Sequence, residues 1–132
     1  MTSPAFVGYA FNRTRNKPLA THVRAARTHW SRLWGLMCVA DDDFPAGYGL
    51  WIQPSQGVHT FAMRFPIDVL YLDRELIVVY LGEQMKPWRI GPIKRKAKSV
   101  LELPGGTLEG TGTRVGDKIE ISVGDAREEV TA

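Results

Sequence analysis

The sequence has 132 residues, of which 44% are hydrophobic and 23% charged, and its formal net charge is +3. This composition is typical of a globular protein and excludes an intrinsically disordered chain. Cys38 is the single cysteine, so an internal disulfide is excluded, and no Cys/His cluster has the spacing of a zinc site. We therefore predict one domain spanning residues 1–132, with no metal site and no cofactor.

Residues 1–12 have no cationic opening followed by an apolar run, and no apolar run of about 18 residues occurs anywhere in the sequence. These features predict a cytoplasmic protein of bacterial type without membrane association. We take it to be a monomer, although the sequence leaves the oligomeric state open. Charge is arranged in blocks, and the block from Gln84 to Ser99 contains lysine and arginine but no acidic residue. Such a block forms either a solvated face or a basic strip.

The first part of the chain predicts two strands. Residues 5–12 and 19–25 are rich in aromatic, small and β-branched side chains. The polar run that ends with Pro18 separates them.

A short helix and another strand are predicted next. Thr28 is a suitable N-cap for a helix over 28–35, whose apolar residues share one face and which ends at Gly35. The acidic loop 41–47 lacks the ligand spacing of a calcium site. Residues 48–53 then predict a strand that ends at a turn.

The clearest strand covers residues 67–72, which alternate between two sets of side chains with Asp68 as the polar exception. Residues 76–81 form a second, nearly continuous apolar stretch. The turn at 73–75 lies between them. We therefore predict an antiparallel hairpin that forms the centre of the core.

The remaining sequence predicts an exposed excursion, two strands and turns. Residues 85–97 contain prolines and a glycine, which exclude a long helix and a central strand. Strands are predicted at 100–103 and 118–123. Between them we expect a turn at 104–107 and one helical turn at 107–110.

Strands at short intervals with frequent proline and glycine turns predict a mainly β fold. We expect a single-domain antiparallel sandwich or barrel with one or two short helices. The sequence contains no Rossmann fingerprint, Walker A loop, G-x-S-x-G elbow or His-Glu-x-x-His helix. These common enzyme classes are therefore excluded.

Five blocks of sequence, in this order and spacing, resemble one family. They are Arg32-x-x-Gly35-Leu36-Met37, Gly49–Ile52, His59–Asp73, Val100–Thr107 and Val115–Asp117. The family is domain-of-unknown-function family 192, and the resemblance covers about residues 20–121. The predicted strand at 5–12 and the acidic tail at 124–132 lie outside it.

The resemblance implies a compact, jelly-roll-like β domain that is found in bacteria and archaea and has no agreed activity. Many relatives carry Trp-Met-Lys-Asn-Thr where this chain has Phe61–Phe65. A role that depends on that Asn or Thr therefore does not transfer to this chain.

Polar residues around the central hairpin predict a binding site for a small polar or anionic ligand. His59 has a side chain suited to proton transfer, and Arg32 is suited to a carboxylate or phosphate. We predict that Arg32, His59 and Asp68 converge, although each has a structural alternative. Arg32 would bridge the helix to Asp68 or Glu102, His59 would bond turn backbone, and Asp68 would accept backbone N–H bonds that fix the entry of its strand. The full predicted ligand set is Arg32, His59, Thr60, Met63, Asp68, Glu102 and Thr107.

Two alternatives stay open on sequence alone. One is a hydrolase that uses His59 and Asp68, with Ser55 as a nucleophile, although no oxyanion turn is identifiable. The other is weak nucleic-acid binding through the basic segment 86–98, in which Trp88 offers stacking and Lys94, Arg95 and Lys96 offer phosphate contacts. The sequence favours a binding module without catalytic residues over an enzyme.

Overall fold

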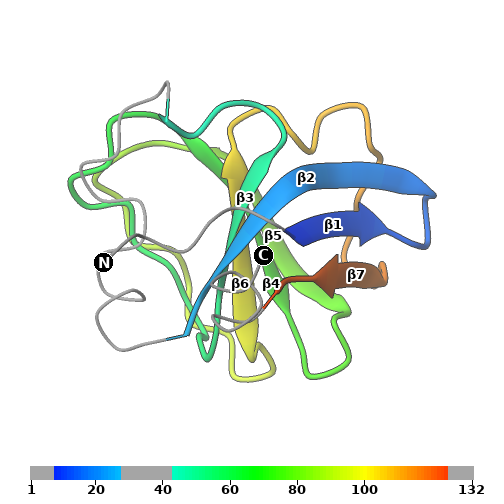
Figure 1. The fold of residues 1–132 in the computed structure, drawn as a ribbon. Coiled ribbons are helices and arrows are strands. Elements are labelled where there is room, and N and C mark those ends of the chain that lie inside the picture. Colours follow the sequence, from blue (N-terminus) through cyan, green and yellow to red (C-terminus); the bar gives the residue numbers. More distant parts are fainter. Residues whose placement is uncertain (1–7, 28–42, 125–132) are drawn as a thin grey trace.

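The structure is a computed structural model that describes residues 8–27 and 43–124 (Figure 1). The predicted helix over 28–35, which carries Arg32, lies outside the described residues. Within the described part of the chain there are β-strands and no α-helix, which confirms the mainly β fold. The strands are β1 (Gly8–Asn12), β2 (Lys17–Ala26), β3 (Tyr48–Ile52), β4 (Ile67–Leu72), β5 (Val78–Met85), β6 (Ser99–Pro104) and β7 (Ile119–Ser122).

The seven strands form one sheet that curls into a half-barrel (Figure 1). The strand order is β5-β4-β6-β3-β2-β1-β7, and only the pair of β2 and β3 is parallel. The two edges meet at one end, where Ile77 bridges Lys118 and the Val78 N–H donates to the Asp117 carbonyl over 2.9 Å. This contact shields part of both edges from pairing with other chains.

The sheet buries side chains on both of its faces. Leu70 and Leu72 belong to the cluster that fills the half-barrel, which we call the inner face. Val69 and Tyr71 alternate with them and pack in a second cluster with residues of the 53–66 and 86–98 loops, on the outer face. Because both faces are covered, every residue of β4 is buried.

The predicted hairpin of β4 and β5 is confirmed, but β5 begins later and runs further than expected. The Asp73 carboxylate accepts hydrogen bonds from the Glu75 N–H (2.8 Å) and the Ile77 N–H (2.9 Å), which extends the turn. Leu76 has a positive φ of 63° and belongs to this turn. Two register irregularities then carry β5 on to Met85.

Two smaller predictions are wrong. The residues at 107–110 form turns rather than a helical turn, because Gly106 and Gly110 take φ values of 94° and 82° that reverse the chain. Pro18 does not precede the second strand, since β2 begins at Lys17. Proline is tolerated there because this first part of β2 extends beyond its pairing with β3.

Asp68 interrupts the apolar pattern of β4 and is fully buried on the inner face. Its Oδ1 accepts the Gln84 N–H and its Oδ2 accepts the Leu108 N–H, each over 2.8 Å. Both oxygens are therefore satisfied by backbone. The carboxylate ties the end of β5 to the turns that follow β6.

Replacing Asp68 with alanine leaves one buried backbone amide, of Leu108, and one partly buried amide, of Gln84, without their acceptor. We expect Asp68→Ala to lower the free energy of unfolding by about 3 kcal/mol, from roughly 1–3 kcal/mol for each unsatisfied buried group. Urea denaturation measures this loss. The matched control is Glu83→Ala on exposed β5 surface, which should stay within about 0.5 kcal/mol of the parent. Equal effects of the two changes would contradict the structural role of Asp68.

Candidate functional site

Two loop segments pair above the outer face and form an irregular antiparallel ribbon. We call residues 55–61 with 88–98 the cover ribbon. The Gly91 N–H donates to the Val58 carbonyl over 2.8 Å near its middle, and further backbone bonds join the two segments toward both ends. The basic excursion of the sequence is thus held by backbone hydrogen bonds, and its side chains are left for the surface.

Tyr71 fixes the cover ribbon to the sheet from below. Its hydroxyl donates to the Pro92 carbonyl over 2.8 Å. Burial, and to a smaller extent the neighbouring Tyr80, raises the pKa of Tyr71 to about 12. Gly91 lies directly over this hydroxyl, where a Cβ atom would come within 2.6 Å of the Tyr71 oxygen. Only glycine allows so close an approach.

Thr60 and Met63 have structural positions. The Thr60 hydroxyl donates to the Lys86 carbonyl over 2.7 Å and accepts the Arg89 N–H over 2.8 Å. Thr60 is fully buried, and Met63 packs in the core of the outer face. Of these two predicted ligand residues, Thr60 therefore holds the ribbon in place and Met63 belongs to the core.

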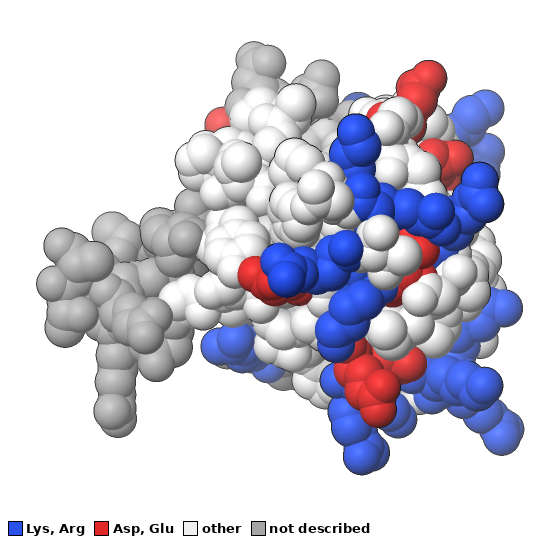
Figure 2. Space-filling view, turned by 90° about the vertical axis from the view of Figure 1, so that its right-hand side faces the viewer, with Lys and Arg blue, Asp and Glu red and all other residues white. Residues whose placement is uncertain are grey.

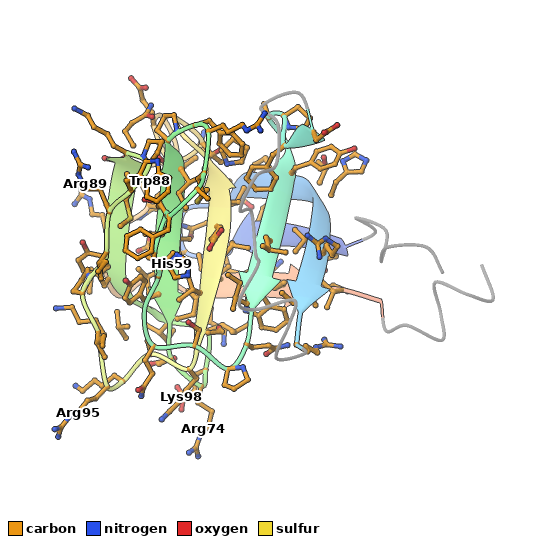
Figure 3. All side chains as sticks on the ribbon, turned by 90° about the vertical axis from the view of Figure 1, so that its left-hand side faces the viewer. His59, Arg74, Trp88, Arg89, Arg95 and Lys98 are labelled. Atoms are coloured by element: carbon orange, nitrogen blue, oxygen red, sulfur yellow. The ribbon has the colours of Figure 1, made fainter. Side chains whose placement is uncertain are left out.

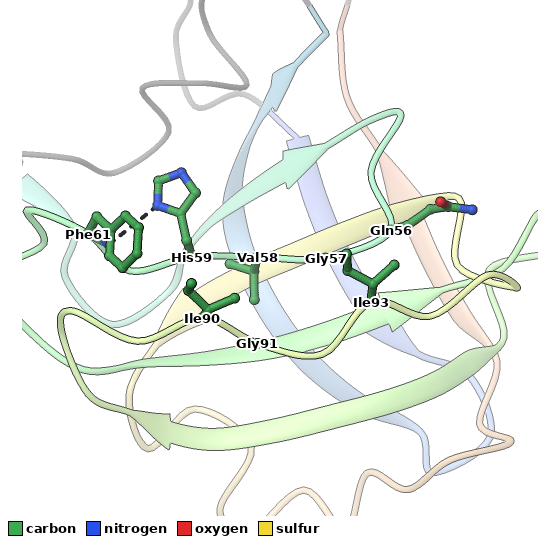
Figure 4. A pocket seen from close by; sticks show the side chains of 8 residues that line it. All are labelled: Gln56, Gly57, Val58, His59, Phe61, Ile90, Gly91 and Ile93. Atoms are coloured by element: carbon green, nitrogen blue, oxygen red, sulfur yellow. Dashed lines mark hydrogen bonds between the residues drawn. The ribbon is translucent and has the colours of Figure 1, made fainter.

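A groove lies on the cover ribbon (Figure 4) and has a volume of about 440 Å³. Its surface is almost entirely apolar. The lining residues are Gln56, Gly57, Val58, His59, Phe61, Ile90, Gly91 and Ile93.

Aromatic rings form one end of this groove. The His59 and Phe61 rings are 5.1 Å apart, and Trp88 lies 6.0 Å beyond Phe61 in a stacked orientation. The Phe61 N–H also points to His59 Nδ1 over 3.4 Å. Trp88 has a positive φ of 63°. The backbone thus turns an indole outward that remains 63% exposed.

Exposed cations lie at both ends of the ribbon. In Figure 3, Arg89 lies beside Trp88 at one end and Arg95 lies at the other, with His59 between them. Lys98 is at the same end as Arg95, where its N–H donates to the Leu72 carbonyl. The apolar groove is therefore flanked by positive charge on two sides.

Arg32, His59 and Asp68 were predicted to converge. His59 and Asp68, the two of them that the structure describes, do not lie together. His59 lies on the cover ribbon above the outer face, and Asp68 points to the inner face. Thr107 lies on the chain next to Leu108, which bonds Asp68, so it belongs with the inner-face group. Arg32 is outside the described residues.

Glu102 lies on β6, and its side chain belongs to the outer face because the alternating Leu101 and Leu103 fill the inner one. It is 3% exposed, and its Oε2 has no hydrogen-bond partner. Burial raises the pKa of Glu102 to about 8, opposed by the charge of Arg24. Burial therefore favours the neutral carboxylic acid over the carboxylate at this position.

The described contacts do not assemble a catalytic triad. The Ser55 hydroxyl donates to the Gly57 carbonyl over 2.7 Å. Asp68 is bonded to backbone on the opposite face from His59. A base–nucleophile–acid arrangement needs hydrogen bonds between these groups.

Among residues 8–27 and 43–124, no group of three or more His, Cys, Asp or Glu side chains is placed to hold a metal ion. The same residues contain no helix with the length and apolar character needed to cross a membrane.

Comparison with known sequences identifies the family. The model of domain-of-unknown-function family 192, described as uncharacterised ACR, matches residues 10–121. The chain belongs to this family. A UPF0127 protein of Pyrococcus furiosus is 34% identical over 114 residues, which cover 83% of this chain and 94% of the relative. One of Thermococcus sibiricus is 31% identical over 121 residues, covering 88% of this chain and 76% of that protein.

Solved structures share the fold of this family 192 protein. A protein of unknown function from Novosphingobium aromaticivorans superposes with a TM-score of 0.71 at 20% identity, over 86% of this chain and 82% of that one. A candidate transcription regulator from Sinorhizobium meliloti gives a TM-score of 0.70 at 20% identity, over 90% and 97%. These likenesses establish the architecture.

The sequence prediction missed the apolar residues of the groove. Ile90 and Ile93 are 72% and 76% exposed, although the segment was expected to be a basic loop. The signal that could have found them is the alternation of large apolar side chains with cations around Gly91-Pro92. Lysines and arginines keep an exposed loop soluble, whereas exposed isoleucines contribute nothing to solubility and mark an interaction surface.

The contact below Gly91 gives a test of how the ribbon is held. We expect Gly91→Ala to lower the free energy of unfolding by about 1–3 kcal/mol, as overpacking does, because its Cβ meets the Tyr71 hydroxyl and Val58. Chemical denaturation measures the loss. In a double-mutant cycle with Tyr71→Phe, part of the cost should disappear, since the hydroxyl is gone. If the effects of the two substitutions on the free energy of unfolding were strictly additive, the cost of Gly91→Ala would not come from the Tyr71 hydroxyl.

Glu102 predicts a pH dependence of stability. Its folded pKa lies above the ordinary value of 4.5, so the folded state retains a proton that the unfolded state loses. Stability is therefore full below about pH 4 and falls as pH rises toward 8. We expect Glu102→Gln to raise the free energy of unfolding at pH 8 by roughly a few kcal/mol and to change little at pH 4. Urea denaturation at both pH values measures this; a difference that does not depend on pH would contradict it.

Proposed function

We propose that this protein is a binding module whose ligand is a small molecule with an apolar body and an anionic group. The groove on the cover ribbon carries this proposal, because it is apolar, accessible and flanked by cations. Pockets of this volume range are usual for small ligands. The ligand is thus more apolar than the sequence alone predicted.

Each part of such a ligand has a matching part of the surface. The apolar body would lie against Val58, Ile90 and Ile93, with the ring of Phe61 at one end. The anionic group would meet Arg89 or Lys94 at the border of the groove, where exposed cations attract without a large desolvation cost. His59 would contribute a polar contact on the wall.

A catalytic role has less support. A hydrolase based on His59 and Asp68 would need both groups at one centre, and they lie on opposite faces of the sheet. Glu102 is buried within the outer face and is not among the residues that line the groove. A binding role without catalysis therefore explains the arrangement of more of the described residues than a hydrolase role does.

Octyl phosphate, used as a monomer below its micelle concentration, tests the proposal. We expect it to raise the melting temperature in proportion to the logarithm of ligand excess, because chain and charge are both engaged. Octanol and inorganic phosphate, each with one half of that chemistry, should give much smaller shifts. A shift as large with phosphate alone would contradict a role for the groove.

The variants for this test are chosen from exposed positions. Ile93→Asp places a charge in the groove and should weaken the binding of octyl phosphate by about tenfold or more. A tenfold change in affinity corresponds to about 1.4 kcal/mol. Val115→Asp is the control, because Val115 is an exposed apolar residue outside the groove. Equal weakening by both variants would rule out this site.

A further inference from the structure

We propose that the cover ribbon docks on the surface of an anionic phospholipid bilayer. This inference rests on the groove of the proposed function and names the source of its amphiphile. Phe61, Trp88, Ile90 and Ile93 would enter the interfacial layer of the bilayer. The neighbouring lysines and arginines would lie at the level of the phosphate groups.

The apolar residues carry the first step of the argument. The large apolar side chains that are exposed in the described part of the chain are Tyr9, Phe61, Trp88, Ile90, Ile93 and Val115, and four of them lie on this one ribbon. Ile90 and Ile93 are the most exposed of the set, at 72% and 76%. A concentration of this kind on a soluble surface marks an interaction site.

The charges carry the second step. The segment from Gln84 to Ser99 contains only basic charged residues. Of the two acids that bound it in sequence, Glu102 is buried, and Glu83 lies on β5 outside the cover ribbon. The other side of the molecule differs, because lysines and arginines are interleaved with acids there (Figure 2). Arg13 is paired with Glu120 and Arg15 with Asp117, for example. The ribbon therefore presents unbalanced positive charge, which anionic lipids complement.

The side-chain types favour a bilayer over a nucleic acid. Bases stack on aromatic rings, and Trp88 already has Phe61 on one side. Isoleucine offers no stacking surface, whereas its transfer from water into an acyl environment is favourable. Tryptophan beside lysine and arginine is the usual composition of an interfacial anchor. Ile90 and Ile93 are thus accounted for by lipid and not by nucleotides.

Backbone hydrogen bonds make this docking compatible with the fold. The ribbon is held by bonds such as Gly91 N–H to Val58 and by the Tyr71 hydroxyl below it. None of these bonds uses the exposed side chains. The exposed residues can therefore be substituted without unfolding the protein, and melting curves verify this for each variant.

Vesicle sedimentation with the full chain tests the inference. We expect the protein to sediment with vesicles of phosphatidylcholine and phosphatidylglycerol, to remain in solution with phosphatidylcholine alone, and to be released as salt is raised. Ile90→Ser/Ile93→Ser should lower the partition coefficient by about tenfold or more, and Val115→Ser should leave it unchanged. Arg95→Glu/Lys96→Glu should also lower it, unlike Lys17→Glu/Arg114→Glu, which changes the net charge equally from outside the ribbon.

Several results would overturn the inference. These are absence of vesicle binding, equal binding to neutral vesicles, or equal loss in the control variants. Tight binding of a single-stranded oligonucleotide that survives Ile90→Ser/Ile93→Ser would assign the surface to nucleic acid instead. Octyl phosphate binding without vesicle binding would leave the proposed function intact and refute docking. Vesicle binding without octyl phosphate binding would support docking and refute the small-molecule site.

Discussion

Burial of β4 on both faces is the constraint on which the other parts of the structure depend. A strand with no exposed residue needs cover above and below it. The inner face obtains cover because the sheet curls until its edge strands meet at Ile77 and Lys118. The outer face obtains it from the cover ribbon, which Tyr71 of β4 itself anchors. The surface with the groove is thus a by-product of covering the outer face of β4.

Two buried carboxyl groups in neighbouring strands show how much local partners matter. Asp68 receives a backbone N–H on each oxygen, so both of its oxygens have partners at the position where it is buried. Glu102 has an oxygen without a hydrogen-bond partner, and burial raises its pKa to about 8. A buried carboxyl group therefore holds backbone in one place, and in the other it lacks a partner and has a pKa raised by burial.

The sequence predicted the β architecture well because alternation is local information. Residues 67–72 were placed without error. β5 begins later than expected, since Asp73 bonds backbone beyond the three-residue turn, and it also runs further, to Met85. The candidate site was harder to predict, because it depends on which loops cover which face of the sheet. Nothing in the order of residues shows that His59 and Asp68 are separated by the sheet. Similarly, the pairing of 55–60 with 88–98 joins segments far apart in the chain.

The way in which the cover ribbon is attached has a consequence for how the protein can change over time. Its stability comes from main-chain bonds, from Gly91 and from a tyrosine beneath it, so the outward side chains are under little structural constraint. Substitutions at Ile90, Ile93 or the cations can accumulate at small cost to folding. A domain built in this way can acquire a new specificity by exchanging a few outward side chains while its architecture stays the same.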